Sequence, residues 1–321
     1  MRTIEEIQKR IAVALTEFDL RRKPVELYQP ISYTLSLGGK RLRPALCLMA
    51  CDMFAGDLEK ALNPAIGIEI FHNFTLLHDD IMDKAPIRRG EKTVYKKWNS
   101  NVAILSGDTM MALAYEYIMK APENVRSKVF SIFNKTAIEV CEGQQYDMNF
   151  ETQNNITIKD YIEMIRLKTA VLLAASLKIG VVLSGADDEY GEALYRFGEN
   201  LGIAFQLKDD LLDVFSEVEK FGKTTGGDIT TNKKTYLYLK AFEKAEGETL
   251  EKLKYLFENN DSDKVNEVKK IYEKLNIREE TENEMNRYFD RAMDFMEIIP
   301  VNENRKSELI KFAKNLSRRE S

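Results

Sequence analysis

Histidine and cysteine are scarce in this sequence, which contains two histidines and three cysteines. Zinc sites in proteins are built mainly from thiolates and imidazoles, so a zinc site fits this chain poorly. Cys47 and Cys51 lie four residues apart in an apolar segment, but no cluster of histidines or cysteines accompanies them. We therefore expect them to be buried, reduced thiols on one helix face.

The sequence also lacks an uninterrupted apolar run of the roughly 20 residues that a membrane-spanning helix needs. Its most apolar stretch, residues 170–184, is interrupted by Lys178 and Gly180, and we predict a buried helix there. The N-terminus carries Glu5 and Glu6, where a signal peptide would need a basic start and an apolar run. These features predict a cytoplasmic protein without a membrane span.

Basic residues are not in excess, because 47 lysines and arginines stand against 52 aspartates and glutamates, for a formal net charge of -5. At this overall charge, a protein that binds nucleic-acid phosphates needs a segregated basic face. No such face is visible in the sequence, and the glycine spacing of nucleotide-binding loops is absent. We therefore expect no nucleic-acid partner.

Alternating, β-branched runs of the kind that predict strands are absent as well. Nearly every long segment instead repeats apolar residues every three or four positions, which is the spacing of a helix packed against a core. We predict an all-α protein. Its expected helices cover residues 3–19, 25–36, 42–55, 59–83, 91–120, 124–148, 157–184, 188–216, 233–245, 248–258, 262–296 and 303–317.

Two short acidic motifs stand out in apolar helical segments. Asp79 and Asp83 are four residues apart, as are Asp209 and Asp213, so each pair shares a helix face. Carboxylates in such surroundings are costly unless they are paired or bound to a metal. One motif alone more often forms a solvated acidic face, whereas two in strongly apolar helices favour a site. Magnesium fits best, because it binds a few carboxylates together with waters and phosphate oxygens.

Other polar residues near these motifs allow more than one role. His78 directly precedes the first motif, and we expect it to pack between helices or to support a ligand rather than to bind metal. Glycines at 38 and 39 precede Lys40 and Arg43, a pattern in which backbone N–H groups and side chains can hold an anion. Further basic candidates are Arg88, Arg89, Lys168, Lys223 and Lys233.

The order of these motifs resembles the trans-isoprenyl diphosphate synthases, also called polyprenyl synthetases, from about residue 25 to the C-terminus. The matching segments are GGKRLRP, DDIMD with two arginines after it, the pair Lys168 and Thr169, and QLKDDLLD followed by GK, GGDI and NKKT. The resemblance implies an isoprenoid-synthase helical bundle around a central cavity, with residues 1–321 forming one domain. The chain departs from the family at Asn232, where glycine is usual, which puts the flexibility of that loop in question.

The resemblance also implies a role for individual residues. Magnesium ligands or their direct and water-mediated supports are Asp79, Asp80, Asp83, Asp209, Asp210 and Asp213. The isopentenyl diphosphate headgroup would bind Lys40, Arg43, His72 and Arg89, with Arg318 or Arg319 closing that site. The allylic diphosphate would contact Arg88, Lys168, Lys223 and Lys233, with Thr169 and Gln206 near the reacting carbons. The catalytic groups would be Asp79, Asp83, Asp209, Lys168, Lys223, Arg88, Thr169 and Gln206.

By the same resemblance, the protein is a prenyltransferase that condenses isopentenyl diphosphate with dimethylallyl, geranyl or farnesyl diphosphate, head to tail and in the trans configuration. It would use three magnesium ions per active site, which manganese could replace, and it would form a homodimer. The glycine-bearing segment 216–232 is the expected lid, because a reactive cation must be kept from water.

Product length should depend on residues upstream of Asp79, along the helix that carries it. Phe74 lies five residues before Asp79 and Phe71 eight, or roughly 7.5 and 12 Å at 1.5 Å per residue. Phe74 and Thr75 resemble short-chain geranylgeranyl synthases of the archaeal type, so we predict a C20 product. Bulky Phe71 leaves farnesyl diphosphate, C15, as the alternative, and either phenylalanine could instead be a core residue.

Two different functions would fit parts of this pattern. A class I terpene cyclase shares the first motif, but such enzymes generally carry an Asn/Ser/Glu metal motif in second position and lack the basic segment. A noncatalytic subunit that regulates a partner synthase tends to lose one aspartate motif, whereas this chain has both. The sequence leaves open the preferred allylic primer, the exact product length, the oligomeric state and the downstream pathway.

Overall fold

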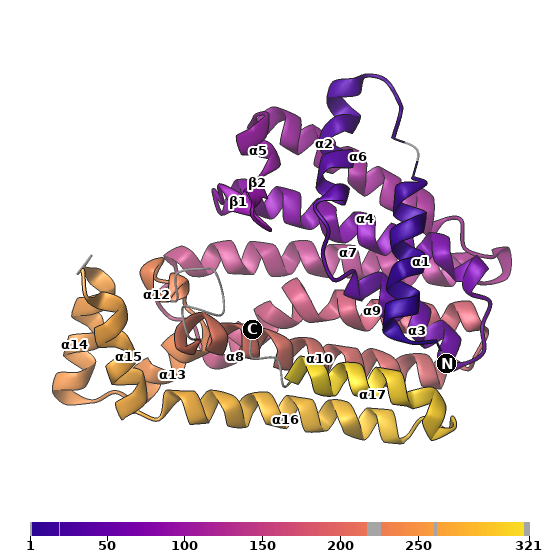
Figure 1. Ribbon diagram of the computed structural model, residues 1–321. Coiled ribbons are helices and arrows are strands. Elements are labelled where there is room, and N and C mark those ends of the chain that lie inside the picture. The colour runs from indigo at the N-terminus through magenta and orange to yellow at the C-terminus, as the bar shows by residue number, and fades with distance from the viewer. Residues whose placement is uncertain (1, 19, 217–225, 260–261, 318–321) are drawn as a thin grey trace. The chain divides into compact units, whose positions relative to one another are not determined.

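The computed structural model describes residues 2–18, 20–216, 226–259 and 262–317. Helices dominate these residues, which confirms the predicted all-α class (Figure 1). Contacts between residues divide the chain into two compact units. Unit 1 comprises Met1–Lys135, Ala175–Glu192 and Val301–Leu309, and unit 2 comprises Thr136–Ala174, Ala193–Pro300 and Ile310–Ser321. The single domain expected for the whole chain stays a prediction.

Unit 1 contains the N-terminal helices and a small hairpin. Its elements are α1 (Ile4–Thr16), α2 (Val25–Ser36), α3 (Leu42–Met53), α4 (Leu58–Met82), β1 (Ile87–Arg88), β2 (Glu91–Lys92), α5 (Val94–Lys97) and α6 (Ser100–Ile118). Parts of α7 (Glu123–Thr152), α9 (Val171–Ser184), α10 (Asp188–Phe215) and α17 (Glu303–Ser317) complete it. Cys47 and Cys51 on α3 are buried free thiols, as predicted.

The central helix of unit 1 is α4, which packs against α3 and α6. Asp57 caps its N-terminus by accepting a hydrogen bond from the Glu59 N–H at 3.0 Å. At Gly67, an added Cβ would lie 2.9 Å from the carbonyl oxygen of Ala114, so the glycine lets α4 and α6 approach closely. Because α4 is buried over most of its length, packing on several sides holds the acidic motif at its C-terminal end.

Unit 2 contains the remaining helices. Its elements are the end of α7, α8 (Ile158–Ile165), the π-helix η1 (Arg166–Ala170), the start of α9, most of α10, α12 (Gly227–Thr230), α13 (Tyr236–Lys244), α14 (Gly247–Glu258), α15 (Lys264–Lys274), α16 (Ile277–Glu297) and the end of α17. Its hydrophobic core includes Tyr161, Leu207, Leu211 and Tyr272. Leu207 precedes the second acidic motif and Leu211 lies within it, so this core fixes the face of α10 on which the aspartates lie.

Three predicted helices are wrong in detail. The segment expected as one helix at 91–120 instead contains strand β2, the short helix α5 and, from Ser100, helix α6. Just before it, Arg89 and Gly90 both have positive φ values and form the turn of the two-stranded β1–β2 hairpin. Such φ values are typical of a two-residue hairpin turn, a strand pairing that the sequence analysis did not predict. The helix expected at 262–296 is divided at Asn276, whose φ is 56°. The helix expected at 157–184 is interrupted by η1.

Among the residues that the structure describes, one helical stretch, Ile158–Ser184, is long and apolar enough to cross a membrane, and 78% of its most apolar window is buried inside the structure. A helix that is apolar on all sides can be either a membrane span or a core helix. Its burial is typical of a core helix, which agrees with the buried helix predicted for residues 170–184.

Candidate active site

The first acidic motif lies at the C-terminal end of α4, beside the β1–β2 hairpin. Arg88 of β1 donates from Nε to Asp80 Oδ1 at 2.6 Å and from Nη2 to Asp79 Oδ2 at 3.2 Å. Asp83 is the C-cap of α4, and its N–H donates to the carbonyl oxygen of Asp79 at 2.8 Å. Burial raises the pKa of Asp80 to about 6, while Arg88 opposes the rise and Asp79 and Asp83 add to it. Three carboxyl groups therefore lie near one another at the C-terminal end of α4.

An arginine-rich site adjoins this motif in unit 1. His72 of α4 has its Nε2 atom 3.0 Å from Nη1 of Arg43 on α3. Burial holds the pKa of His72 well below its usual value, and the nearby Arg43, Arg89, Arg88 and Arg41 lower it further. The imidazole is therefore neutral among four guanidinium groups. Because a guanidinium binds phosphate oxygens in a bidentate manner, this site is suited to a diphosphate.

The glycine loop before α3 supports the arginine-rich site. Gly39 has a φ of +122°, and an added Cβ would lie 2.9 Å from Cζ of Arg89. Arg89 also donates from Nη1 to the carbonyl oxygen of Gly38. Lys40 is exposed in the same loop, and its carbonyl oxygen accepts a hydrogen bond from Gln8. Glycine at 39 therefore provides both the backbone conformation and the space for Arg89.

Arg41 and Arg43 have different roles, of which the sequence analysis predicted only the second. Arg41, the left-handed N-cap of α3, pairs with Glu69 of α4 and donates to the carbonyl oxygen of Leu35. Arg43 has its Nε buried and without a hydrogen-bond partner among the described residues. Arg41 therefore anchors the loop to α4, while Arg43 keeps a donor for an anion.

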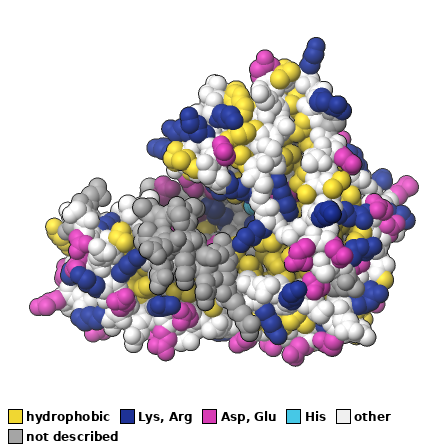
Figure 2. All heavy atoms as spheres, viewed as in Figure 1, with side chains coloured by type: hydrophobic (Ala, Val, Ile, Leu, Met, Phe, Trp, Pro, Cys, Tyr) yellow, Lys and Arg dark blue, Asp and Glu magenta, His cyan; other side chains and the backbone are white. Residues whose placement is uncertain are grey.

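Basic side chains gather over the hairpin and α5. Figure 2 shows Lys and Arg side chains together on this part of unit 1, where Lys92, Lys96 and Lys97 are exposed. Nζ of Lys97 lies 3.6 Å from the ring centroid of Tyr33. Of the basic residues in this segment, only Arg88 and Arg89 were predicted from the sequence. The resulting local positive charge would raise the concentration of anions near the first motif.

The second acidic motif belongs to unit 2, on α10. Asp210 is buried and accepts hydrogen bonds from the Tyr161 hydroxyl and from Gln206 Nε2, the latter at 3.2 Å. Burial raises the pKa of Asp210 to about 6, although both hydrogen bonds oppose the rise. Oδ2 of Asp213 accepts the N–H of Asp228 at 2.9 Å. These hydrogen bonds therefore fix the orientations of the Asp210 and Asp213 carboxylates.

Lys168 and Thr169 lie in η1, next to α7 and α10. Nζ of Lys168 is 2.5 Å from Oδ2 of Asp147 on α7. The Thr169 hydroxyl donates to Oε1 of Gln206 on α10 at 3.3 Å. Since Gln206 also donates to Asp210, a hydrogen-bonded chain connects Thr169 with the second acidic motif.

Lys233 and Asp228 lie at the other end of this motif. The backbone N–H of Lys233 donates to the carbonyl oxygen of Asp228 at 2.8 Å. Burial raises the pKa of Asp228 to about 7, with Lys233 opposing the rise and Asp210, Asp213 and Asp147 adding to it. Four carboxylates of unit 2 thus influence one another electrostatically.

The two phenylalanines predicted to limit product length are buried in unit 1, in a row of aromatic contacts. Ring centroids are 5.5 Å apart between Phe71 and Phe74, 5.2 Å between Phe71 and Phe133, and 4.8 Å between Phe74 and His78. An added Cβ at Gly107 of α6 would lie 2.2 Å from Nε2 of His78. His78 therefore packs between helices, as expected. Thr75 is half-buried, and its hydroxyl donates to the carbonyl oxygen of His72 at 2.8 Å.

The carboxylates fit a hard divalent cation. Within the described ranges, no three histidine, cysteine, aspartate or glutamate side chains form a ready-made metal cluster. Each acidic motif nevertheless offers oxygen donors, the kind that magnesium and calcium prefer. Burial and like charge raise the pKa values of Asp80 and Asp210, and a bound cation would relieve both causes.

Some predicted residues fall outside the part of the chain that the structure describes. They are Lys223, Arg318 and Arg319, together with residues 217–225 of the expected lid. Conversely, sequence reasoning gave no role to Asp147, Tyr161 and Asp228. Asp228 was part of the recognised GGDI segment, which could have identified it. Asp147 and Tyr161 are 21 and 49 residues from their partners, and no local pattern indicates such pairs.

An all-α scaffold with two aspartate motifs and an arginine-rich cluster suited to a diphosphate is typical of the prenyltransferases that act on diphosphates. The chain belongs to the polyprenyl synthetase family, which it matches over residues 24–275. It is 43% identical over 249 residues to a geranylgeranyl diphosphate synthase of Methanosarcina mazei, covering 76% of this chain and 77% of that protein. It is 40% identical over 238 residues to a geranylfarnesyl diphosphate synthase of Natronomonas pharaonis, covering 68% and 70%.

Solved structures agree with this assignment. A crystal structure of a geranylgeranyl pyrophosphate synthase matches with a TM-score of 0.93 and 40% identity, covering all of both chains. A polyprenyl synthase of Caulobacter crescentus matches with a TM-score of 0.86 and 28% identity, covering 98% of this chain and 97% of that one. The latter protein was crystallised with calcium and isoprenyl diphosphate. The chain is thus a prenyltransferase of a family that uses divalent metal ions.

Proposed function

We propose that the protein is a magnesium-dependent, short-chain prenyl diphosphate synthase that condenses isopentenyl diphosphate with allylic diphosphates, with geranylgeranyl diphosphate as its main product. The observation that carries this proposal is the neutral His72 among Arg41, Arg43, Arg88 and Arg89, directly beside the first acidic motif. Arg88 links the two features, because it also pairs with Asp79 and Asp80. A terpene cyclase needs no separate anion site for isopentenyl diphosphate, whereas a synthase does.

The isopentenyl diphosphate would bind at the arginine-rich site. Arg43 and Arg89 supply guanidinium groups, Lys40 supplies a point charge, and His72 adds a neutral hydrogen-bonding group. The neutral imidazole matters, since a positive charge there would repel the arginines around it. Arg41 contributes indirectly by holding the loop to Glu69. Arg318 or Arg319 remains our proposal for a group that closes this site.

The allylic diphosphate would bind through magnesium ions for which both acidic motifs supply ligands. Asp79, Asp83 and Asp209 would hold three magnesium ions, with Asp80, Asp210 and Asp213 in support, and manganese could replace magnesium. The ions, when bound, neutralise charge on the leaving diphosphate. Arg88, Lys168, Lys223 and Lys233 add positive charge around the same group.

The reaction then needs no protein nucleophile. The allylic carbon–oxygen bond breaks, and its electron pair leaves with the diphosphate. The double bond of isopentenyl diphosphate attacks the resulting cation and forms the new carbon–carbon bond. A proton leaves the adjacent carbon, with the released diphosphate as the base, and a new double bond forms. Thr169 and Gln206, which are hydrogen-bonded to each other, would border the reacting carbons.

Phe74, with Phe71 behind it, would limit the length of the product. The two rings are in contact, and Phe133 of α7 supports Phe71. A chain that grows along α4 from Asp79 would meet Phe74 first, at roughly 7.5 Å for five residues. This position favours C20 over the longer C25 product, with C15 as the next candidate.

The test is an assay with labelled isopentenyl diphosphate and each of the dimethylallyl, geranyl and farnesyl diphosphates, with and without magnesium. We expect magnesium-dependent chain extension that ends at C20. Cyclised product from the allylic substrate alone would indicate a terpene cyclase. Activity only after addition of a second protein would indicate a regulatory subunit.

We also propose that the protein is a cytoplasmic homodimer. The helix α6 exposes Ile104 and Leu105, at 46% and 58% of their surface, and burial of these apolar side chains between two subunits would be favourable. Sedimentation of the wild-type protein and of Leu105→Glu would test this. A monomeric wild-type protein would contradict it.

A further inference from the structure

The π-helix η1 interrupts the helical run between α8 and α9. The Val171 N–H donates to the carbonyl oxygen of Arg166, five residues earlier, whereas an α-helix joins residues four apart. Single π-turns inside α-helices are frequently found at functional sites. Here the turn contains Lys168 and Thr169, whose backbone position therefore depends on whatever stabilises η1.

Two glycines on different helices of unit 2 contact the backbone of η1. At Gly143 of α7, an added Cβ would lie 2.2 Å from the backbone nitrogen of Lys168 and 2.7 Å from its Cα. At Gly202 of α10, it would lie 2.6 Å from the Cα of Ala170. The atoms in the way belong to the backbone of η1 and cannot rotate aside. Any side chain at 143 or 202 would have to displace η1 or its neighbouring helix.

Each glycine is followed, four residues later, by a polar side chain that bonds to η1. Asp147 follows Gly143 and pairs with Lys168, and Gln206 follows Gly202 and accepts the hydrogen bond of Thr169. Residues four apart lie on the same helix face. Each of the helices α7 and α10 therefore contacts η1 in two ways. A glycine lets the two backbones approach closely, and a polar side chain binds a residue of η1.

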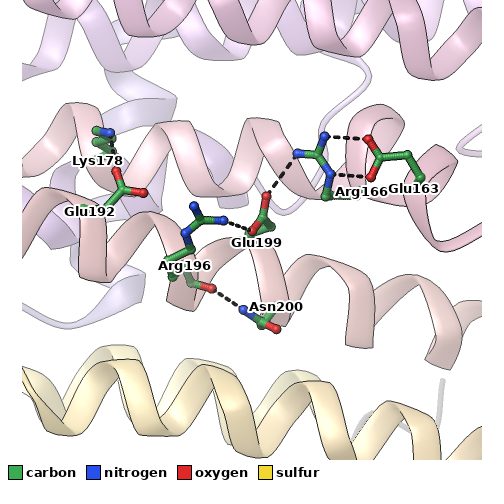
Figure 3. A network of polar contacts seen from close by, with 7 residues as sticks. All are labelled: Glu163, Arg166, Lys178, Glu192, Arg196, Glu199 and Asn200. Carbon is green, nitrogen blue, oxygen red and sulfur yellow. Dashed lines mark hydrogen bonds and ion pairs between the residues drawn. The ribbon is translucent and has the colours of Figure 1, made fainter. Parts of the chain in front are cut away.

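Arg166, the first residue of η1, is fixed by carboxylates. Figure 3 shows Arg166 between Glu163 of α8 and Glu199 of α10, with nitrogen–oxygen distances of 2.7 Å to Glu163 and 3.1 Å to Glu199. Glu199 is buried and also accepts a hydrogen bond from Arg196 at 3.0 Å. The hydrogen bond to Glu163 is the main cause that raises the pKa of Arg166. Ion pairs thus fix the start of η1, and close backbone contacts with Gly143 and Gly202 fix its later residues.

We propose that Gly143 and Gly202 are positioning residues for the reaction, which set Lys168 and Thr169 at the distance required by the allylic diphosphate. This inference rests on the roles proposed above for Lys168 and Thr169. The absence of a side chain at 143 and 202 determines how closely α7 and α10 approach η1, and hence where the Lys168 ammonium group lies. An error of about 1 Å in such a group can lower a rate by about 100-fold.

The test uses Gly143→Ala and Gly202→Ala, with Gly191→Ala as the matched control. Gly191 is also a buried glycine of α10, but an added Cβ there would lie 3.6 Å from Cγ of Lys178, an ordinary contact. We expect both test variants to raise the KM for the allylic diphosphate and to lower kcat, together by about 10- to 100-fold in kcat/KM. The KM for isopentenyl diphosphate should change less than twofold, and the control should behave as wild type.

A double-mutant cycle separates positioning from general loss of packing. If Gly143 acts through Lys168, then Gly143→Ala should have little further effect in a Lys168→Ala background, because coupled residues are not additive. Equal losses in both backgrounds would overturn the proposal, as would unchanged allylic kinetics in Gly143→Ala. If Lys168→Ala itself has wild-type kinetics, the proposed role of Lys168 and this inference both fail. If only Lys168→Ala is impaired, the inference alone fails.

Folding is checked by thermal melting of every variant. If Gly143→Ala does not fold, the same cycle is made with Gly202→Ala and Thr169→Val, since Gly202 contacts η1 from the other helix. If neither glycine variant folds, the two residues are needed for packing, and the positioning role is rejected.

Discussion

Removal of the Tyr161 hydroxyl should destabilise the protein to a degree that depends on pH. Tyr161 and Asp210 are 2% and 3% exposed, so water cannot replace the lost hydrogen bond in Tyr161→Phe. A hydrogen bond to a charged group contributes roughly 1.5 to 3 kcal/mol. Gln206 still donates to the other oxygen of Asp210, which places the expected loss at about 2 kcal/mol when Asp210 is ionised.

The sign of the pH dependence follows from the pKa of Asp210. Burial raises this pKa to about 6, above the roughly 3.9 of an unfolded chain, so Asp210 in the folded protein is ionised at pH 8 and largely protonated at pH 5. At pH 5 the lost bond joins two neutral groups and contributes about 1 kcal/mol. The loss in unfolding free energy should therefore be about twice as large at pH 8.

Urea unfolding of metal-free protein at pH 5 and pH 8 measures both values. The matched control is Tyr272→Phe, because Tyr272 is a buried tyrosine of the same core, whereas the hydrogen bonds to Asp210 come from Tyr161 and Gln206. The control should show a loss below about 1 kcal/mol and no pH dependence. An equal loss at both pH values for Tyr161→Phe, or a larger one at pH 5, would refute the reasoning.

Four further predictions concern the two proposed substrate sites. Phe74→Ala should extend the product beyond C20 in chromatography and cost about 3 kcal/mol of stability; an unchanged length distribution would remove Phe74 from that role. Arg43→Met should raise the KM for isopentenyl diphosphate by about 10-fold or more, equivalent to about 1.4 kcal/mol, and leave the allylic KM within twofold. Removal of divalent metal with a chelator should abolish turnover, and magnesium or manganese should restore it; turnover in excess chelator would contradict the metal proposal. Because the pKa of His72 is lowered in the folded protein, His72 binds a proton below about pH 6.5 more readily in the unfolded state than in the folded state. Stability should therefore fall as the pH drops below that value, and His72→Gln should reduce this fall in urea unfolding.

Local sequence signals predicted most helices but missed the places where the backbone changes direction. Arg89 and Asn276 adopt positive φ values, which few residues other than glycine do readily. The apolar spacing continues across Asn276, so it indicated one helix at 262–296 where the structure has a break. Arg89 lies between the helices expected at 59–83 and 91–120, where the turn of a hairpin was not predicted. The π-turn at η1 was missed for a related reason: one extra residue in a helical turn hardly disturbs the spacing of apolar residues around it.

The sequence by itself determined the all-α class, the two acidic helix faces and the basic glycine loop, because each depends on residues within about one helical turn. Only the tertiary structure decided with which distant residue each polar side chain of the site pairs. The partners of Asp210, Lys168 and Arg41 lie 49, 21 and 28 residues away. Such pairs form only when packed helices bring distant segments together. The close approach at Gly143 and Gly202 has the same origin, since a glycine in the sequence does not show which backbone will lie against it.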